Sequence, residues 1–168
     1  MKDISLWGLQ IERHPDVPED VFNRIACVIQ EEYEQVREMG FKFHLALGAK
    51  VVPGALCPTG GKYEFAGMIT IAADLPETAP ASPDRVDGSL RGFIRHELGR
   101  AVHRRFLLDK RVDVEFMDRA YEDEHAPVSR YAMKDYGELF AESFVAYVAN
   151  PKAKISRPLA TLFDGETS

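Results

Sequence analysis

The sequence predicts a single α+β domain, and three observations support this. Its 168 residues are the size of one ordinary globular domain. Short stretches of alternating or β-branched apolar residues lie in the first half, around one long helical pattern, whereas helical spacing dominates the second half. A small sheet followed by a run of helices is typical of the α+β class. With neither repeat nor linker, residues 1–168 are expected to fold as one unit, with an N-terminal helix and strands in 1–50 and the main core in 51–163.

The first fifty residues predict a strand, a helix and a second strand. Apolar residues recur between Ile4 and Ile11, including Trp7, which predicts a short strand. Asp16, followed by Pro18 and Glu19, has the pattern of a helix N-terminus with Asp16 as the N-cap. Helical spacing of apolar residues then runs over 21–39, and Gly40 ends the helix. Alternation over 41–47 predicts a half-buried strand.

The remaining elements follow from turn residues and apolar spacing. Residues 53–62 are expected to form a loop, 67–74 a strand, and the proline-rich stretch 75–89 a surface loop. Ser89 is expected to cap a helix that extends to Leu108. Residues 111–126 are ambiguous between strand and helix. Asp135 begins a further helix that Pro151 ends, and a short terminal helix is expected over 158–163.

Composition and charge exclude several classes of function. The net charge of −6 disfavours a nucleic-acid partner, because phosphate neutralisation requires clustered Lys and Arg. Residues 1–13 do not have the pattern of a signal peptide, and no stretch approaches the ~20 apolar residues that span a bilayer, so no membrane partner is expected. The two cysteines indicate no disulfide framework. A cytoplasmic protein and an excised secreted or effector domain both fit this pattern.

One helix carries most of an HExxH metal motif. In that motif two histidines four residues apart reach one Zn²⁺ from the same helix face, and the Glu activates a metal-bound water. Here His96 and Glu97 are present, but Arg100 occupies the second histidine position. His103 is an unsuitable substitute, because it lies roughly 10 Å from His96 along the helix axis. A His-Glu pair on a helix is also common as solvated surface.

A second helix places two carboxylates on one face. Glu138 and Glu142 are four residues apart on an otherwise apolar helix. A simpler interpretation exists for Glu138, since Asp135 with Glu138 is a capping box. The helix pattern by itself does not decide between a ligand and a cap.

The two segments together resemble the zincin domain of anthrax lethal factor and the related Pro-Pro endopeptidases. That family has a His-Glu helix, then a Tyr, and seven residues later a Glu that opens an E-F-F-A-E-x-F helix. This sequence has His96-Glu97, then Tyr131, then Glu138-Leu139-Phe140-Ala141-Glu142-Ser143-Phe144. The resemblance covers about 51–163, which would be the catalytic core, and it implies a single-domain, gluzincin-like zincin fold with the third metal ligand on the C-terminal helix.

The resemblance also implies a role for each matching residue. His96 and Glu138 would be Zn²⁺ ligands, Glu97 the general base and Tyr131 the oxyanion donor, with Glu142 orienting a ligand imidazole. The strand that begins at Gly67, Met68, Ile69 and Thr70 would be the sheet edge that pairs with an extended peptide substrate. The function implied is a zinc-dependent metalloendopeptidase acting on a peptide or protein, and the Pro-Pro preference is not carried over.

Arg100 departs from the family. A guanidinium has no lone pair for a metal, so we expect little or no hydrolysis. We hypothesise that Arg100 fills the metal site by pairing with Glu138 or Glu97. The arginine is either an inactivating change to a parent that had His here or a native feature of a pseudoenzyme. Impaired peptidase, non-catalytic peptide or protein binder, and structural component all remain open.

Overall fold

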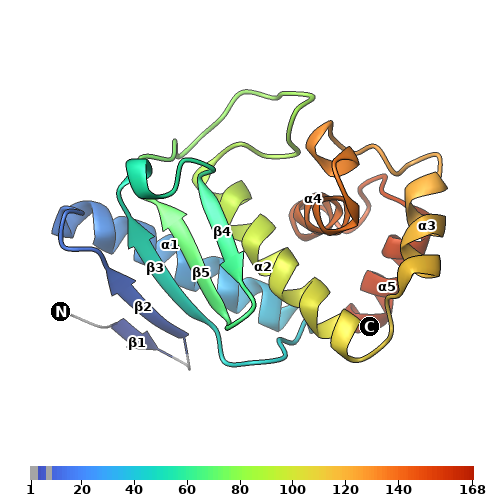
Figure 1. Cartoon of the computed structure of the whole chain (residues 1–168), viewed down its shortest axis with the longest axis horizontal. Helices are drawn as coiled ribbons and strands as arrows, with labels where there is room; N and C mark the ends of the chain where they lie inside the picture. Colours follow the sequence, from blue (N-terminus) through green and yellow to red (C-terminus); the bar gives the residue numbers. More distant parts are fainter. Residues whose placement is uncertain (1–3, 7–8) are drawn as a thin grey trace.

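The structure is a computed structural model that describes residues 4–6 and 9–168, with side chains from residue 9 onward. Trp7, which we placed in the first strand, lies outside the described residues. The described strands form one mixed sheet in the order β1-β2-β3-β5-β4 (Figure 1). Their bounds are Ile4–Leu6, Leu9–Arg13, Gly48–Val52, Gly61–Glu64 and Met68–Ala72 for β1 to β5. The pairs β2–β3 and β3–β5 are parallel, whereas β1–β2 and β4–β5 are antiparallel.

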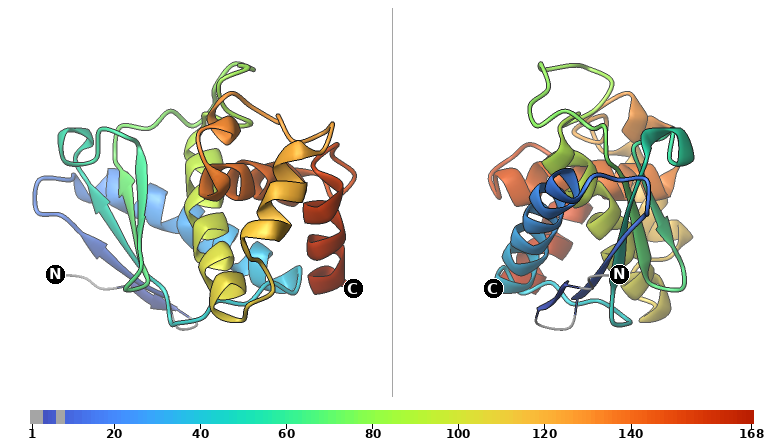
Figure 2. Two further views of the ribbon diagram at one scale, coloured as in Figure 1. Left: turned by 45° about the vertical axis from the view of Figure 1, so that its right-hand side comes forward. Right: turned by 90° about the vertical axis from the view of Figure 1, so that its left-hand side faces the viewer.

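The helices cover one face of the sheet and build the second half of the molecule. Helix α1 packs behind the sheet, α2 crosses the centre of the molecule, and α3, α4 and α5 lie on its far side (Figures 1 and 2). The bounds of α1 to α5 are Glu19–Glu38, Leu90–Leu108, Val114–Glu122, Tyr136–Ala149 and Arg157–Thr167, with 3₁₀ turns η1 at Gly54–Leu56 and η2 at Tyr131–Met133. One apolar core joins α1, the sheet, α2 and α4.

The predicted α+β class and single domain are confirmed. Strand β3 spans residue 50, so the sheet runs continuously across the division that we drew between 1–50 and 51–163. Ser89 and Asp135 cap α2 and α4 as expected, and α5 is longer than the predicted 158–163. The ambiguous stretch 111–126 contains helix α3.

Four local predictions were wrong. The single strand predicted between Ile4 and Ile11 is the antiparallel pair β1 and β2. Residues 41–47 form no strand; Phe41 and Leu47 are buried but Leu45 is 48% exposed, and the strand begins only at Gly48. Helix α1 begins at Glu19 after Pro18, with no side-chain cap from Asp16. The loop predicted over 53–62 ends early, because β4 begins at Gly61. The alternation over 41–47 therefore reflects an irregular segment that is buried mainly at its two ends, Phe41 and Leu47.

The strand expected to form the sheet edge is an interior strand. Strand β5 pairs with β3 on one side and with β4 on the other, so Gly67, Met68, Ile69 and Thr70 cannot offer a free edge to a peptide. Their backbone groups are already used in the sheet. Among the described strands, β4 is the edge on the side of α2 (Figure 1). The sequence missed this because β4 is short and rich in polar residues.

Helices α2 and α4 pack closely at one glycine. A Cβ at Gly99 would lie 2.9 Å from Phe144 Cδ1, closer than van der Waals contact permits. Glycine in a helix interior costs about 0.5–1 kcal/mol relative to alanine. Here it permits an approach that brings the polar residues of α2 and α4 together. Within the described part of the chain, no helix has the length and apolarity needed to cross a membrane.

Candidate functional site

Helices α2 and α4 carry the centre of the site. His96 and Glu97 lie on α2 and are only 3% and 4% exposed. Helix α4 presents Glu138 in its first turn, where Asp135 Oδ1 accepts a 2.9 Å hydrogen bond from the Glu138 backbone N–H. The cap therefore fixes where α4 begins, and with it the position of the Glu138 carboxylate opposite α2.

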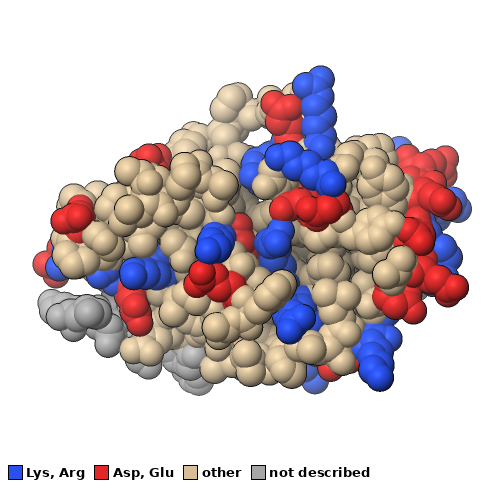
Figure 3. All heavy atoms as spheres, viewed as in Figure 1, with Lys and Arg blue, Asp and Glu red and all other residues tan. Residues whose placement is uncertain are grey.

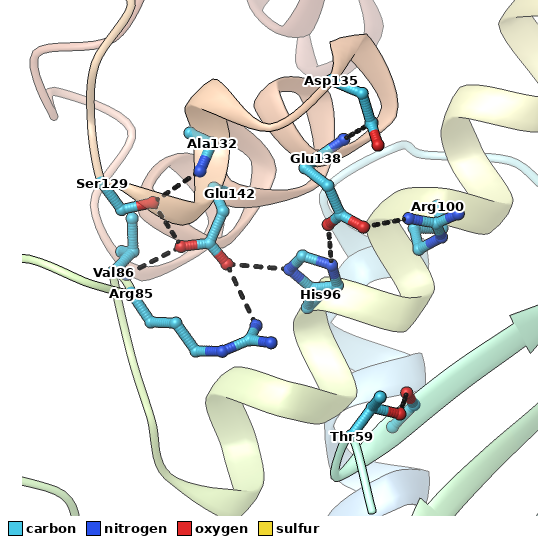
Figure 4. Close-up of polar contacts among 11 residues, drawn as sticks. Thr59, Arg85, Val86, His96, Arg100, Ser129, Ala132, Asp135, Glu138 and Glu142 are labelled. Atoms are coloured by element: carbon cyan, nitrogen blue, oxygen red, sulfur yellow. Dashed lines mark hydrogen bonds and ion pairs between the residues drawn. The ribbon is translucent and has the colours of Figure 1, made fainter.

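His96 is held between two carboxylates (Figure 4). Its Nε2 lies 2.8 Å from Glu138 Oε2, and its Nδ1 lies 2.8 Å from Glu142 Oε1. The other oxygen of Glu142 accepts hydrogen bonds of 2.8 Å from the Ser129 hydroxyl and from the Val86 backbone N–H. Glu142 is thus fixed by three donors, and it orients the imidazole as the resemblance implied.

Arg100 contacts the carboxylate oxygen of Glu138 that His96 does not contact. Its Nη1 donates a 2.6 Å hydrogen bond to Glu138 Oε1 (Figure 4). Of the two pairings that we hypothesised, the structure therefore shows Arg100–Glu138. The Asp135 cap is present but involves only the backbone N–H of Glu138, whose carboxylate meets His96 and Arg100. The buried polar face of α4 is thus turned toward α2.

The electrostatics follow from these pairs. Burial opposes protonation of His96, but Glu138 and Glu142 outweigh it and raise the pKa of His96 to about 9. Burial likewise favours the neutral acids, yet the contacts with His96 hold the pKa values of Glu138 and Glu142 below their ordinary range. In the described centre His96 and Arg100 thus contact the two carboxylates directly, and the Arg85 guanidinium lies 3.7 Å from Glu142.

Glu97 stands apart from this network. Burial raises its pKa to about 7, and its Oε2 is buried with no hydrogen-bond partner among the described residues. Its Oε1 lies against the start of β4, because a Cβ at Gly61 would be 2.9 Å away. An unpaired carboxyl oxygen buried at this depth is costly unless a ligand meets it.

These side chains line an open cleft of about 230 Å³ between β4, α2 and η2. Figure 3 shows Lys and Arg side chains at the boundary between the sheet and the helical half of the molecule. The lining comprises Thr59, Gly61, Lys62, Tyr63, Arg85, His96, Glu97, Arg100, Tyr131 and Glu138. The structure thus brings together every residue assigned to the centre from the sequence except Glu142, which supports His96 from behind.

Tyr131 is fixed by cations on its ring. The Arg85 guanidinium lies 3.8 Å and the Lys134 ammonium 4.0 Å from the ring centroid. The ring centroid lies 5.7 Å from that of His96, and burial raises the pKa of the phenol. The hydroxyl is therefore a neutral hydrogen-bond donor at neutral pH, in the cleft where the resemblance placed it.

Sequence reasoning missed Arg85 and Ser129. Arg85 lies in the proline-rich loop 75–89, which docks on η2 through backbone hydrogen bonds from Arg130 to Pro83 and from Tyr131 to Asp84. Nothing in the local sequence distinguishes Arg85 from a solvated surface arginine. Ser129 lies two residues before Tyr131, but a lone serine carries no signal of its partner.

The residues present do not fit a catalytic zinc. A tetrahedral zinc at about 2.1 Å from each ligand separates two donor atoms by about 3.4 Å. His96 Nε2 and Glu138 Oε2 are only 2.8 Å apart, which is the spacing of a direct ion pair. The second histidine position of the motif is occupied by Arg100, whose guanidinium cannot donate a lone pair and instead contacts Glu138.

His103 lies about two turns along α2 from His96, on the same face toward α4 but outside the cleft. Its ring stacks on Phe140 at 4.5 Å, and burial lowers its pKa to about 4. It is absent from the cleft lining, which agrees with the expectation that it does not replace the missing ligand.

Comparison of the sequence with known protein-family profiles gives no match, and comparison with curated proteins gives no significant match.

Proposed function

We propose that this protein is a zincin-type peptide-binding protein, in which Arg100 replaces a metal-ligating histidine and the cleft holds an extended peptide without hydrolysing it. The observation that carries this proposal is the contact chain His96–Glu138–Arg100, with spacings of 2.8 and 2.6 Å. These two contacts occupy both oxygens of the Glu138 carboxylate, which would otherwise bind a metal. The two cations also neutralise the carboxylates that would repel each other in a metal-free site.

The edge of β4 supports an extended peptide as the ligand. The strand pairs with β5 on one side, and the cleft adjoins its first three residues on the α2 side. An edge strand offers backbone N–H and C=O groups to a partner strand, which gives affinity with little dependence on side chains. The peptide-pairing role that we had assigned to Gly67–Thr70 therefore passes to β4, Gly61–Glu64.

A second candidate is a zinc metalloendopeptidase impaired by Arg100. The specific observation in its favour is that Glu97, Tyr131 and Glu138 line one cleft with His96, the arrangement that the resemblance to lethal factor and the Pro-Pro endopeptidases implies. Glu97 stands where the resemblance expects the general base, although its burial there is unfavourable. Replacing Arg100 by histidine tests both candidates.

The experiment measures zinc per chain by elemental mass spectrometry after saturation and desalting. We expect no zinc for the wild-type chain and about one zinc for Arg100→His. About one zinc in the wild type would refute replacement of the metal by Arg100. If Arg100→His binds none while remaining folded by circular dichroism, the zincin-type assignment itself is refuted.

Glu97→Gln separates a binder from a peptidase. In a binder cleavage stays absent and peptide binding is retained, because glutamine keeps an acceptor oxygen, whereas in a peptidase the substitution abolishes turnover. The assay is cleavage of a fluorogenic peptide library by the wild type, Arg100→His and Arg100→His/Glu97→Gln. Metal-dependent cleavage by the wild-type chain would establish the second candidate in place of the first.

A further inference from the structure

The cleft contains two guanidinium groups whose donors are not saturated by carboxylates. Arg100 is 33% exposed and uses Nη1 on Glu138. Arg85 Nη1 lies 3.7 Å from Glu142 Oε1, beyond hydrogen-bonding distance, and the Arg85 guanidinium is held by the rings of Tyr131 and Phe93. Each guanidinium has five N–H donors. Both groups are therefore positioned in advance and able to bind a further acceptor.

The same cleft contains a buried acceptor that lacks a donor. Glu97 is 96% buried, lines the cleft, and leaves Oε2 without a partner. Glu97 and Arg100 are three residues apart on α2, so their Cβ atoms lie about 5–6 Å apart on one helix face. The Glu97 carboxyl oxygen, an acceptor, and the Arg100 guanidinium N–H groups, which are donors, are thus neighbours on α2.

This pairing fits the chemistry of one peptide residue. A residue with a carboxylate offers an anion for a guanidinium and, a few bonds away, a backbone N–H for a carboxyl oxygen. A phosphate carries up to two negative charges beside Glu97, against one for a carboxylate, so its repulsion from Glu97 is greater. Lys62 also lines the cleft, but its ammonium is paired with Glu64 at 2.9 Å, so Arg85 and Arg100 are the groups that meet the ligand.

The direction of β4 determines where the carboxylate of a paired peptide would lie. Gly61, the first residue of β4, lies against Glu97, whereas the turn after the strand brings Phe65 under the Arg104 guanidinium at 4.6 Å. A peptide that pairs antiparallel to β4 runs from the Glu64 end toward Gly61. Its C-terminal end therefore arrives beside Glu97, Arg100 and Arg85.

We propose that the cleft recognises a carboxylate of an extended peptide, held by Arg85 and Arg100, with the adjoining backbone N–H donated to Glu97. This rests on the proposed peptide-binding function and names its ligand class. The carboxylate comes either from the C-terminus of the peptide or from an Asp or Glu side chain. In this role Arg100 does more than occupy a metal position: it selects the ligand.

The test uses three pools of octapeptides with neutral randomised positions and an uncharged fluorophore at the N-terminus. One pool has a free C-terminus, one has a C-terminal amide, and one has the amide plus a single Glu. Binding to the full chain is measured by fluorescence anisotropy at low and high salt. We expect at least one carboxylate pool to bind about ten-fold or more tightly than the neutral amide pool, with the preference weakened by salt.

The two carboxylate pools distinguish the two sources, and variants identify the residues. Arg85→Gln and Arg100→Gln should each remove most of the preference, whereas Lys152→Gln, which removes one charge from an exposed turn after α4, should retain it. The comparison of pools on the wild-type chain does not depend on how the variants fold. Equal binding of all three pools would overturn this inference and leave the proposed function standing. No binding of any pool would overturn both.

Discussion

Replacing Arg100 by glutamine removes the guanidinium from Glu138 while keeping a polar side chain of similar length. A hydrogen bond to a charged group contributes about 1.5–3 kcal/mol to stability when it is buried. Two features of the site reduce that figure: Arg100 is 33% exposed, and Glu138 retains His96 at 2.8 Å. We therefore expect Arg100→Gln to lower the free energy of unfolding by about 1–2 kcal/mol.

The measurement is urea unfolding at pH 7 followed by circular dichroism, with thermal unfolding alongside. For a chain of 168 residues this loss corresponds to a fall in Tm of about 2–8 °C. A double-mutant cycle with Glu138→Gln should give a coupling of about 1 kcal/mol or more. Arg130→Gln is the matched control, because Arg130 pairs with Asp84 at 3.3 Å with both side chains more than two-thirds exposed, and it should change stability by less than about 0.5 kcal/mol.

One result would refute the reasoning. If Arg100→Gln matches the Arg130→Gln control and the cycle with Glu138 shows no coupling, the guanidinium does not neutralise Glu138 in solution. Arg100 would then not take the place of a metal, whatever the protein binds.

Three further predictions concern pH and packing. The pKa of His96 is raised from 6.5 to about 9, so its contribution to stability is complete below pH 6.5 and is lost as the pH rises through 9. NMR titration of the imidazole should show a midpoint near 9. A midpoint near 6.5 would contradict the paired geometry. The contribution of His103 to stability has the opposite pH dependence, because burial lowers its pKa to about 4. This contribution is lost as the pH falls from 6.5 through 4, and about 2 kcal/mol is lost at pH 5. His103→Phe, which keeps the stacking on Phe140, should abolish that acid sensitivity in urea unfolding at pH 5 and 7, and an unchanged pH dependence would assign it to other groups. Gly99→Ala should destabilise the protein by about 1–3 kcal/mol despite the better helix propensity of alanine, because its Cβ would meet Phe144 at 2.9 Å. Thermal unfolding measures the change. A stabilised variant would show that α2 and α4 are not so close.

The sequence by itself determined the helices of the site and the spacing of their polar residues. Ser89 and Asp135 are caps whose effect is local, and a helix turns three- and four-residue spacing into a shared face, so the places of His96, Arg100 and Glu138 on their helices were predictable. The alternation over 41–47 misled because buried side chains on an irregular segment produce the same pattern as a strand.

Only the tertiary structure decided which partner each polar group meets. Arg100 had two candidate carboxylates at suitable spacing, and the approach of α2 to α4 at Gly99 brings it to Glu138. Sheet order likewise depends on contacts between distant segments, so the edge passes from β5 to β4 although β5 has the stronger strand pattern. Arg85 reaches the cleft from a loop without local signal, because its position is set by hydrogen bonds to residues more than forty positions away.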